Sequence, residues 1–152
     1  MNAIICPELK KLDSLLKKLD DENLSLIIIN DNEIIFSSKK EGMIPLLEAV
    51  ERMDALKLSG SIVIDKIIGK AAALIICYFK AKVIHTKILS LKAIKILDDY
   101  SIEYSAEKTI PEIMNKPGTD ICPFEKTVSD TNSPAEGYIR LKELVKKMNI
   151  HS

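Results

Sequence analysis

The sequence predicts one α/β domain with a five-stranded mixed sheet and helices on both of its faces. Two apolar runs at residues 24–29 and 34–36 flank an Asn-Asp-Asn turn at residues 30–32, a pattern typical of a β-hairpin. Three further apolar runs then alternate with helical patterns, at residues 61–64, 82–86 and 102–105. A hairpin followed by strand–helix alternation indicates antiparallel and parallel strands in the same sheet. The length of 152 residues suits a single domain.

The helices are predicted from apolar residues at helical spacing between these strands. We expect helices over residues 7–21 and 45–56, each beginning at a proline, and over residues 90–100, where Ser90 is the N-cap. Residues 66–79 are apolar nearly all round. This segment therefore predicts a helix in the middle of the domain rather than on its surface.

The chain becomes less regular after the fifth strand. We expect a core over about residues 7–106 and a C-terminal extension over residues 107–152. The extension begins with one helical turn near residues 109–115 and a short helix over residues 122–128. A Ser-Pro-Ala-Glu capping box at residues 133–136 then starts a last helix.

The charge and cysteine content exclude several classes of partner. The formal net charge is zero and only two of the 22 basic residues are arginine, which argues against binding to nucleic acid. The longest apolar stretch, residues 71–79, is too short to span a membrane, and no signal peptide opens the chain. Three scattered cysteines (Cys6, Cys77 and Cys122) indicate free thiols in a reducing compartment. We expect a cytoplasmic protein.

The first candidate site is the segment over residues 65–73, where a strand gives way to the buried helix. Ligands of open α/β sheets bind outside the carboxyl ends of strands, and helix N-termini attract anions. Lys66 and Lys70 are four residues apart and would share a helix face, while Gly69 would allow close approach of the backbone. The alternative is that Asp65 caps the helix, Gly69 packs, and both lysines are solvated.

The second candidate is the loop over residues 115–125, which is rich in turn formers and polar groups and begins at Asn115. Cys122 directly precedes a short helix and could be a reactive thiol, with Glu125 facing the same way. The alternative is an inert cysteine packed under the loop.

The third candidate is the polar loop over residues 37–42, from Ser37 to Gly42, at the carboxyl end of the second strand. The alternative is a plain surface loop. His85 stands alone in a strand and predicts a structural role, and His151 lies in the terminal tail. These two histidines and the scattered cysteines form no zinc site of familiar spacing.

The segments IFSSKKEGMIPLLEAV, DKIIGKAAALI and CPFEKTV, in this order of elements, resemble a family of small uncharacterised proteins from anaerobic bacteria and archaea. That family is similar in fold to the cytidine deaminases, and the resemblance covers about residues 14–128. It implies a cytidine-deaminase-like, three-layer α/β/α fold with a C-terminal helical extension.

Zinc-dependent deaminases place H-x-E or C-x-E at the start of the helix after the second strand, and P-C-x-x-C after the third. Here these places read EGMIP (residues 41–45) and DKIIGK (residues 65–70), so the zinc ligands and the proton-transferring glutamate are absent. We therefore expect no metal or cofactor and no zinc-dependent deamination.

Our leading hypothesis is a nucleotide or another phosphorylated small molecule bound where two helix N-termini converge, with the extension closing over it. The residues expected to line this site are Ser37, Gly42, Asp65, Lys66, Gly69, Lys70, Asn115, Cys122 and Glu125. A second hypothesis is another class of enzyme, with Cys122 as nucleophile or Lys70 as amine, and Asp65 or Glu125 as acid or base. A third is a non-catalytic regulatory or interaction module that forms a homodimer.

Overall fold

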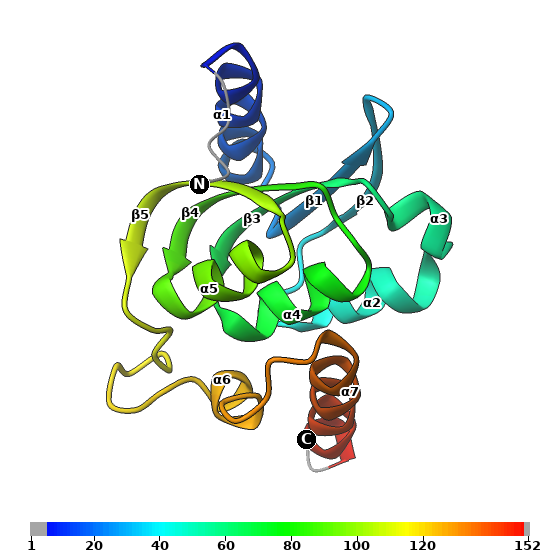
Figure 1. Cartoon of the computed structure of the whole chain (residues 1–152). Coiled ribbons are helices and arrows are strands. Elements are labelled where there is room, and N and C mark those ends of the chain that lie inside the picture. Colours follow the sequence, from blue (N-terminus) through cyan, green and yellow to red (C-terminus); the bar gives the residue numbers. More distant parts are fainter. Residues whose placement is uncertain (1–5, 151–152) are drawn as a thin grey trace.

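The computed structural model describes residues 6–150, and the side chain of Cys6 and all of His151 lie outside the described part. Its sheet has five strands in the order β2-β1-β3-β4-β5 (Figure 1). β1 pairs antiparallel with β2 and β3, whereas β3, β4 and β5 are parallel, which confirms the predicted mixed sheet. The strands are β1 (Leu26–Asn30), β2 (Glu33–Ser38), β3 (Ile62–Ile68), β4 (Val83–Ser90) and β5 (Glu103–Ile110).

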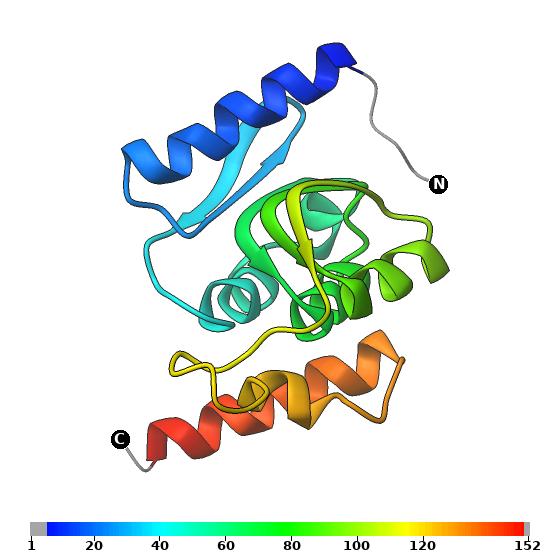
Figure 2. The ribbon, with the colours of Figure 1, turned by 90° about the vertical axis from the view of Figure 1, so that its left-hand side faces the viewer.

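The helices lie on both faces of this sheet, as predicted. α1 (Cys6–Asp21) covers one face, where its buried leucines pack on alternate residues of β1 and β3. The other face carries α2 (Ile44–Arg52), α3 (Ala55–Leu58), α4 (Lys70–Tyr78) and α5 (Leu91–Asp99). The extension adds α6 (Pro123–Thr127) and α7 (Pro134–Ile150), which lie outside α4 (Figure 2).

α4 is the centre of the domain, because it lies between the sheet and α7. Every residue from Lys70 to Cys77 is buried, as the all-round apolar pattern predicts. Gly137 lets α7 approach closely, since a Cβ at that position would lie 2.9 Å from a side-chain carbon of Leu74. The extension is therefore part of the same packed unit.

Several predicted boundaries were wrong. The helix expected from residue 66 begins only at Lys70, because β3 continues its parallel pairing with β4 as far as Ile68. The helical turn expected near residues 109–115 is absent, because β5 extends to Ile110. The helix expected over residues 45–56 ends at Arg52, and a separate turn, α3, follows it. The predicted Ser90 cap is confirmed, since its side chain accepts a hydrogen bond from the Ala93 N–H.

Candidate functional site

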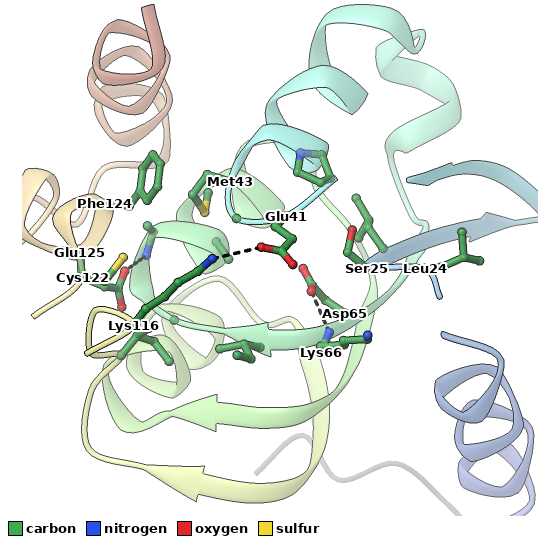
Figure 3. Close-up of a pocket in the computed structure, with 18 of the residues that line it drawn as sticks. Leu24, Ser25, Glu41, Met43, Asp65, Lys66, Lys116, Cys122, Phe124 and Glu125 are labelled. Atoms are coloured by element: carbon green, nitrogen blue, oxygen red, sulfur yellow. Dashed lines mark hydrogen bonds and ion pairs between the residues drawn. The ribbon is translucent and has the colours of Figure 1, made fainter. Parts of the chain in front are cut away.

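A cavity of about 450 Å³ lies at the carboxyl end of β3, and its walls come from all three candidate segments (Figure 3). The segment over residues 37–42 contributes Lys39, Glu41 and Gly42. The segment over residues 65–73 contributes Asp65, the end of β3 and the first turn of α4. The loop over residues 115–125 contributes a further wall. Three polar segments far apart in the sequence thus converge on one space large enough for a small-molecule ligand.

The polar group at the floor of this cavity is the carboxyl of Asp65. It lies in β3 opposite Leu26 of β1, and its Oδ1 accepts a hydrogen bond of 2.7 Å from the Lys66 N–H. Burial raises the pKa of Asp65 to about 7, against the opposing effect of the N–H groups of Lys66 and Ile67. A carboxyl with a pKa near 7 can hold or release a proton under ordinary conditions.

Glu125 of α6 occupies the start of α4. Its carboxylate accepts hydrogen bonds from the N–H groups of Lys70 at 2.8 Å and Ala71 at 2.6 Å, and it is only 7% exposed. Burial raises the pKa of Glu125, while these two N–H groups oppose the shift. Gly69 makes the contact possible, because a Cβ there would lie 2.3 Å from Glu125 Oε1. The anion-binding end of α4 is therefore satisfied from within the chain.

The two lysines proposed for this site have other partners. Lys70 does not line the cavity, because its buried amine donates a 3.2 Å hydrogen bond to the Ser129 carbonyl oxygen, and burial lowers its pKa. Lys66 lines the cavity, but its ammonium lies 4.0 Å from the carboxylate of Asp20 in α1. Since Lys66 is in β3 and not in α4, the prediction that the two share a helix face was wrong.

The start of α2 also contributes to the cavity, which Met43 and Pro45 line. Met43 is the N-cap and its side chain makes no capping hydrogen bond; because Pro45 has no N–H, the donors at the start of α2 are the N–H groups of Ile44 and Leu46. At the mouth, the ammonium of Lys116 lies 3.4 Å from the carboxylate of Glu41, and both side chains are more than 80% exposed (Figure 3). Lys39 also lines the cavity.

The remaining predicted site residues divide into two groups. Cys122 is half-buried and lines the cavity, whereas Cys77 is buried in α4, where burial raises the pKa of its thiol to about 12. Asn115 and Ser37 do not line it. The Asn115 carboxamide oxygen instead accepts the N–H of Thr119 at 3.0 Å and so closes the turn of its own loop. Ser37 is exposed on β2.

Several lining residues of the cavity were not predicted from the sequence. Phe124, Ile113 and Met114 come from the extension, while residues 23–26 come from the link between α1 and β1 and from the first residue of β1. Phe124 lies within a predicted segment but carries no chemistry that singles it out. Residues 23–26 become part of the site only through the pairing of β1 with β3, which no local pattern reveals.

The described residues 6–150 contain neither a cluster of metal ligands nor a membrane-spanning helix. No three side chains of histidine, cysteine, aspartate or glutamate come together there in a way that could hold a metal ion. No helix in the same range is both long and apolar enough to cross a membrane.

Comparisons with known proteins agree with the fold. A family model described as a domain of unknown function (DUF1893, TM1506) matches residues 14–145. A solved DUF1893 protein of Thermotoga maritima is 35% identical, with 97% of this chain and 95% of that chain covered and a TM-score of 0.78. A solved dCMP deaminase of the cyanophage S-TIM5 is 10% identical over 70% of this chain and 100% of its own, with a TM-score of 0.50, which shows the fold alone. No curated protein matches the chain.

Proposed function

Because the chain belongs to the DUF1893 family, whose description assigns no activity, we propose a function from the cavity itself: it binds a small phosphorylated molecule of the size of a nucleotide. The observation that carries the proposal is the pairing of an uncapped helix start with the half-buried carboxyl of Asp65 in one cavity of about 450 Å³. The first offers hydrogen-bond donors to an anion, and the second offers an acceptor to a polar group.

The phosphate is assigned to the start of α2. Of the two helix starts at the cavity, that of α4 already binds the Glu125 carboxylate, whereas that of α2 has no side-chain cap. Lys39 and the exposed Lys116 also line the cavity. The Lys116–Glu41 ion pair is exposed and therefore weak, so the lysine can exchange its partner for a phosphate at little cost.

The other end of the ligand is assigned to the floor, against Asp65. A heterocyclic amino group or a sugar hydroxyl would donate a hydrogen bond to this carboxyl, which has few donors of its own around it. Leu24 and Leu26 line the cavity at the start of β1, where Leu26 is paired with Asp65, and supply apolar walls for a flat ring. This division into a polar floor, apolar walls and a cationic mouth suits a nucleotide better than inorganic phosphate alone.

A second candidate function is proton transfer catalysed in the same cavity. Burial places the pKa of Asp65 at about 7, so that the carboxyl can act as acid or base near neutral pH. A nucleophilic role for Cys122 stays a prediction. Glu125 is not free to serve as its acid or base, because its carboxylate binds the N–H groups at the start of α4. An amine role for Lys70 is not favoured, because Lys70 does not line the cavity.

The experiment is a thermal-shift screen of nucleoside 5′-monophosphates, dCMP among them, and of sugar phosphates, each paired with its dephosphorylated form. Calorimetric titration of any hit then compares Lys116→Ala and Asp65→Asn with the matched control Lys146→Ala, on the exposed part of α7. We expect both site variants to weaken binding roughly tenfold, about 1.4 kcal/mol each, and the control to leave it unchanged. Loss of the phosphate group should weaken binding in the wild type.

Two outcomes would count against the proposal. Stabilisation by none of the phosphorylated compounds would remove it, and equal binding of a compound with and without phosphate would remove the phosphate assignment.

We expect the protein to act in the cytoplasm, because the thiols of Cys77 and Cys122 are free in the structure.

A further inference from the structure

A second cluster of reactive side chains lies on the opposite face of the sheet. Alternate residues of β4 face opposite layers: Ile84 packs into the core around α4, while Val83 packs with α1. His85 therefore faces α1, and it is only 2% exposed. Its two ring nitrogens meet Ser105 of β5 and Asp13 of α1.

The hydrogen bonds of this cluster fix the proton on the ring. His85 Nε2 lies 2.8 Å from Asp13 Oδ1, and His85 Nδ1 is hydrogen-bonded to Ser105 Oγ. A carboxylate can only accept, so Nε2 carries a hydrogen, and in the neutral ring Nδ1 is then an acceptor. The Ser105 hydroxyl consequently donates to Nδ1. A hydroxyl, a base and a carboxylate that orients the base are thus connected in sequence.

The hydroxyl end of this chain of hydrogen bonds is partly exposed with respect to residues 6–150. Ser105 is half-buried at the sheet edge, directly beside His85 in the register of β4 and β5. α1 packs mainly on β3 and β4, so β5 lies at the margin of its cover. Because β5 is an edge strand, the N–H groups on its outer side pair with no other strand in the described part of the chain and can act as donors.

We propose that Ser105, His85 and Asp13 form a nucleophilic acyl-transfer site, separate from the cavity and independent of the function proposed for it. Ser105 is the nucleophile, His85 the general base and Asp13 a positioning residue. Such a triad is recognised by its geometry and not by the order of its members along the chain. Here the carboxylate contacts Nε2 and the hydroxyl contacts Nδ1. In serine proteases the carboxylate contacts Nδ1 and the hydroxyl contacts Nε2.

The reaction follows from these contacts. Ser105 Oγ forms a bond to the acyl carbon of an ester while its proton passes to His85 Nδ1. The bond between the acyl carbon and the leaving oxygen breaks, and that oxygen takes the proton from Nδ1. Water then repeats both steps at the acyl-serine, releasing the carboxylic acid and restoring the hydroxyl.

The substrate class is an uncharged, activated acyl ester. Glu103 and Glu107 lie two residues to either side of Ser105 on the same face of β5, and these carboxylates disfavour an anionic substrate. The reactive group must also be small, since Ser105 lies beside the edge of α1 and lines neither the cavity at the end of β3 nor the one between α4 and α7.

The test is covalent labelling of the full-length protein with a neutral alkyl fluorophosphonate, in which Ser105 Oγ displaces fluoride from phosphorus and the proton goes to His85. Intact mass and peptide mapping locate the adduct, which we expect on Ser105 alone. Ser105→Ala should remove it. Asp13→Asn, at a side chain that is 57% exposed and so compatible with folding, should slow labelling roughly 100-fold.

Two matched variants serve as controls. Ser37→Ala removes an exposed strand hydroxyl that has no histidine beside it, and Asp21→Asn removes an exposed carboxylate from the same helix as Asp13. Both should label at the wild-type rate. The proposal is overturned if Ser105 acquires no adduct, or if Asp13→Asn labels as fast as Asp21→Asn, because the cluster would then only join α1 to the sheet.

Discussion

The carboxylate of Glu125 offers the sharpest test of how the extension is joined to the core. Substitution by alanine leaves two buried donors, the N–H groups of Lys70 and Ala71, without the acceptors that lie 2.8 and 2.6 Å away. Each orphaned donor costs about 1–3 kcal/mol when water does not replace the acceptor. Because the adjoining cavity can admit water, we take the lower end of the range, about 1–1.5 kcal/mol for each donor, and expect a loss of about 2–3 kcal/mol for Glu125→Ala.

Thermal and urea unfolding measure this loss directly. For a chain of this length, 2–3 kcal/mol corresponds to a fall in Tm of roughly 5–10 °C. Glu125→Gln keeps one carbonyl acceptor and should lose about half as much. Glu107→Ala, at an exposed position on β5, is the control and should change stability by less than about 0.5 kcal/mol. A fall for Glu125→Ala no greater than that of Glu107→Ala would refute the capping role of Glu125.

Three further predictions concern the same region. Asp65 binds its proton more tightly in the folded protein, so its contribution to stability is complete below about pH 4 and is lost as the pH rises through about 7. After allowance for water in the cavity, we expect this pH-dependent part of the free energy of unfolding to be about 1–2 kcal/mol. Asp65→Asn should remove it, as measured by urea unfolding at several pH values. Iodoacetamide should alkylate Cys122 in the native protein and spare Cys77, whose pKa burial raises to about 12, until the protein unfolds; equal rates by peptide mass spectrometry would contradict this. Gly69→Ala should lower the free energy of unfolding by about 2 kcal/mol or more, since its Cβ would lie 2.3 Å from a carboxylate oxygen of α6, and an unchanged urea midpoint would count against that packing.

The fold was predictable because its signals are local. The Asn-Asp-Asn turn between two apolar runs specifies the β1–β2 hairpin, and two of its residues, Asp31 and Asn32, adopt the positive φ angles that such a turn needs. The all-round apolar segment became the central helix α4. The boundary of that helix was missed because a strand of isoleucines and a buried helix have the same composition where they meet.

The site was predictable in its position but not in its electrostatics. That the polar segments gather at the end of β3 follows from the rule for open α/β sheets. The partner of the α4 start is Glu125, which is 54 residues away from Ala71 along the chain. No local pattern shows that a carboxylate from the extension will take the place of an external anion, so the sequence alone suggested a free positive helix end.

The pairing of Asp13 and Ser105 with His85 illustrates the same limit. None of the three residues lies in a motif that points to catalysis. Asp13 and His85 are 72 residues apart along the chain, and no local pattern in the sequence predicts their contact. Only the parallel register of β4 and β5, together with the placement of α1 across the sheet, brings them into contact.

Backbone amide chemical shifts during titration with a nucleoside monophosphate test the central claim most directly. We predict that the N–H resonances of Ile44 and Leu46, at the uncapped start of α2, move in proportion to the fraction of bound ligand. Those of Lys70 and Ala71 should move little, because Glu125 retains them. Shifts concentrated at Lys70 and Ala71 and absent from α2 would contradict the assignment of the phosphate, and an absence of saturable shifts around the cavity would contradict the binding itself.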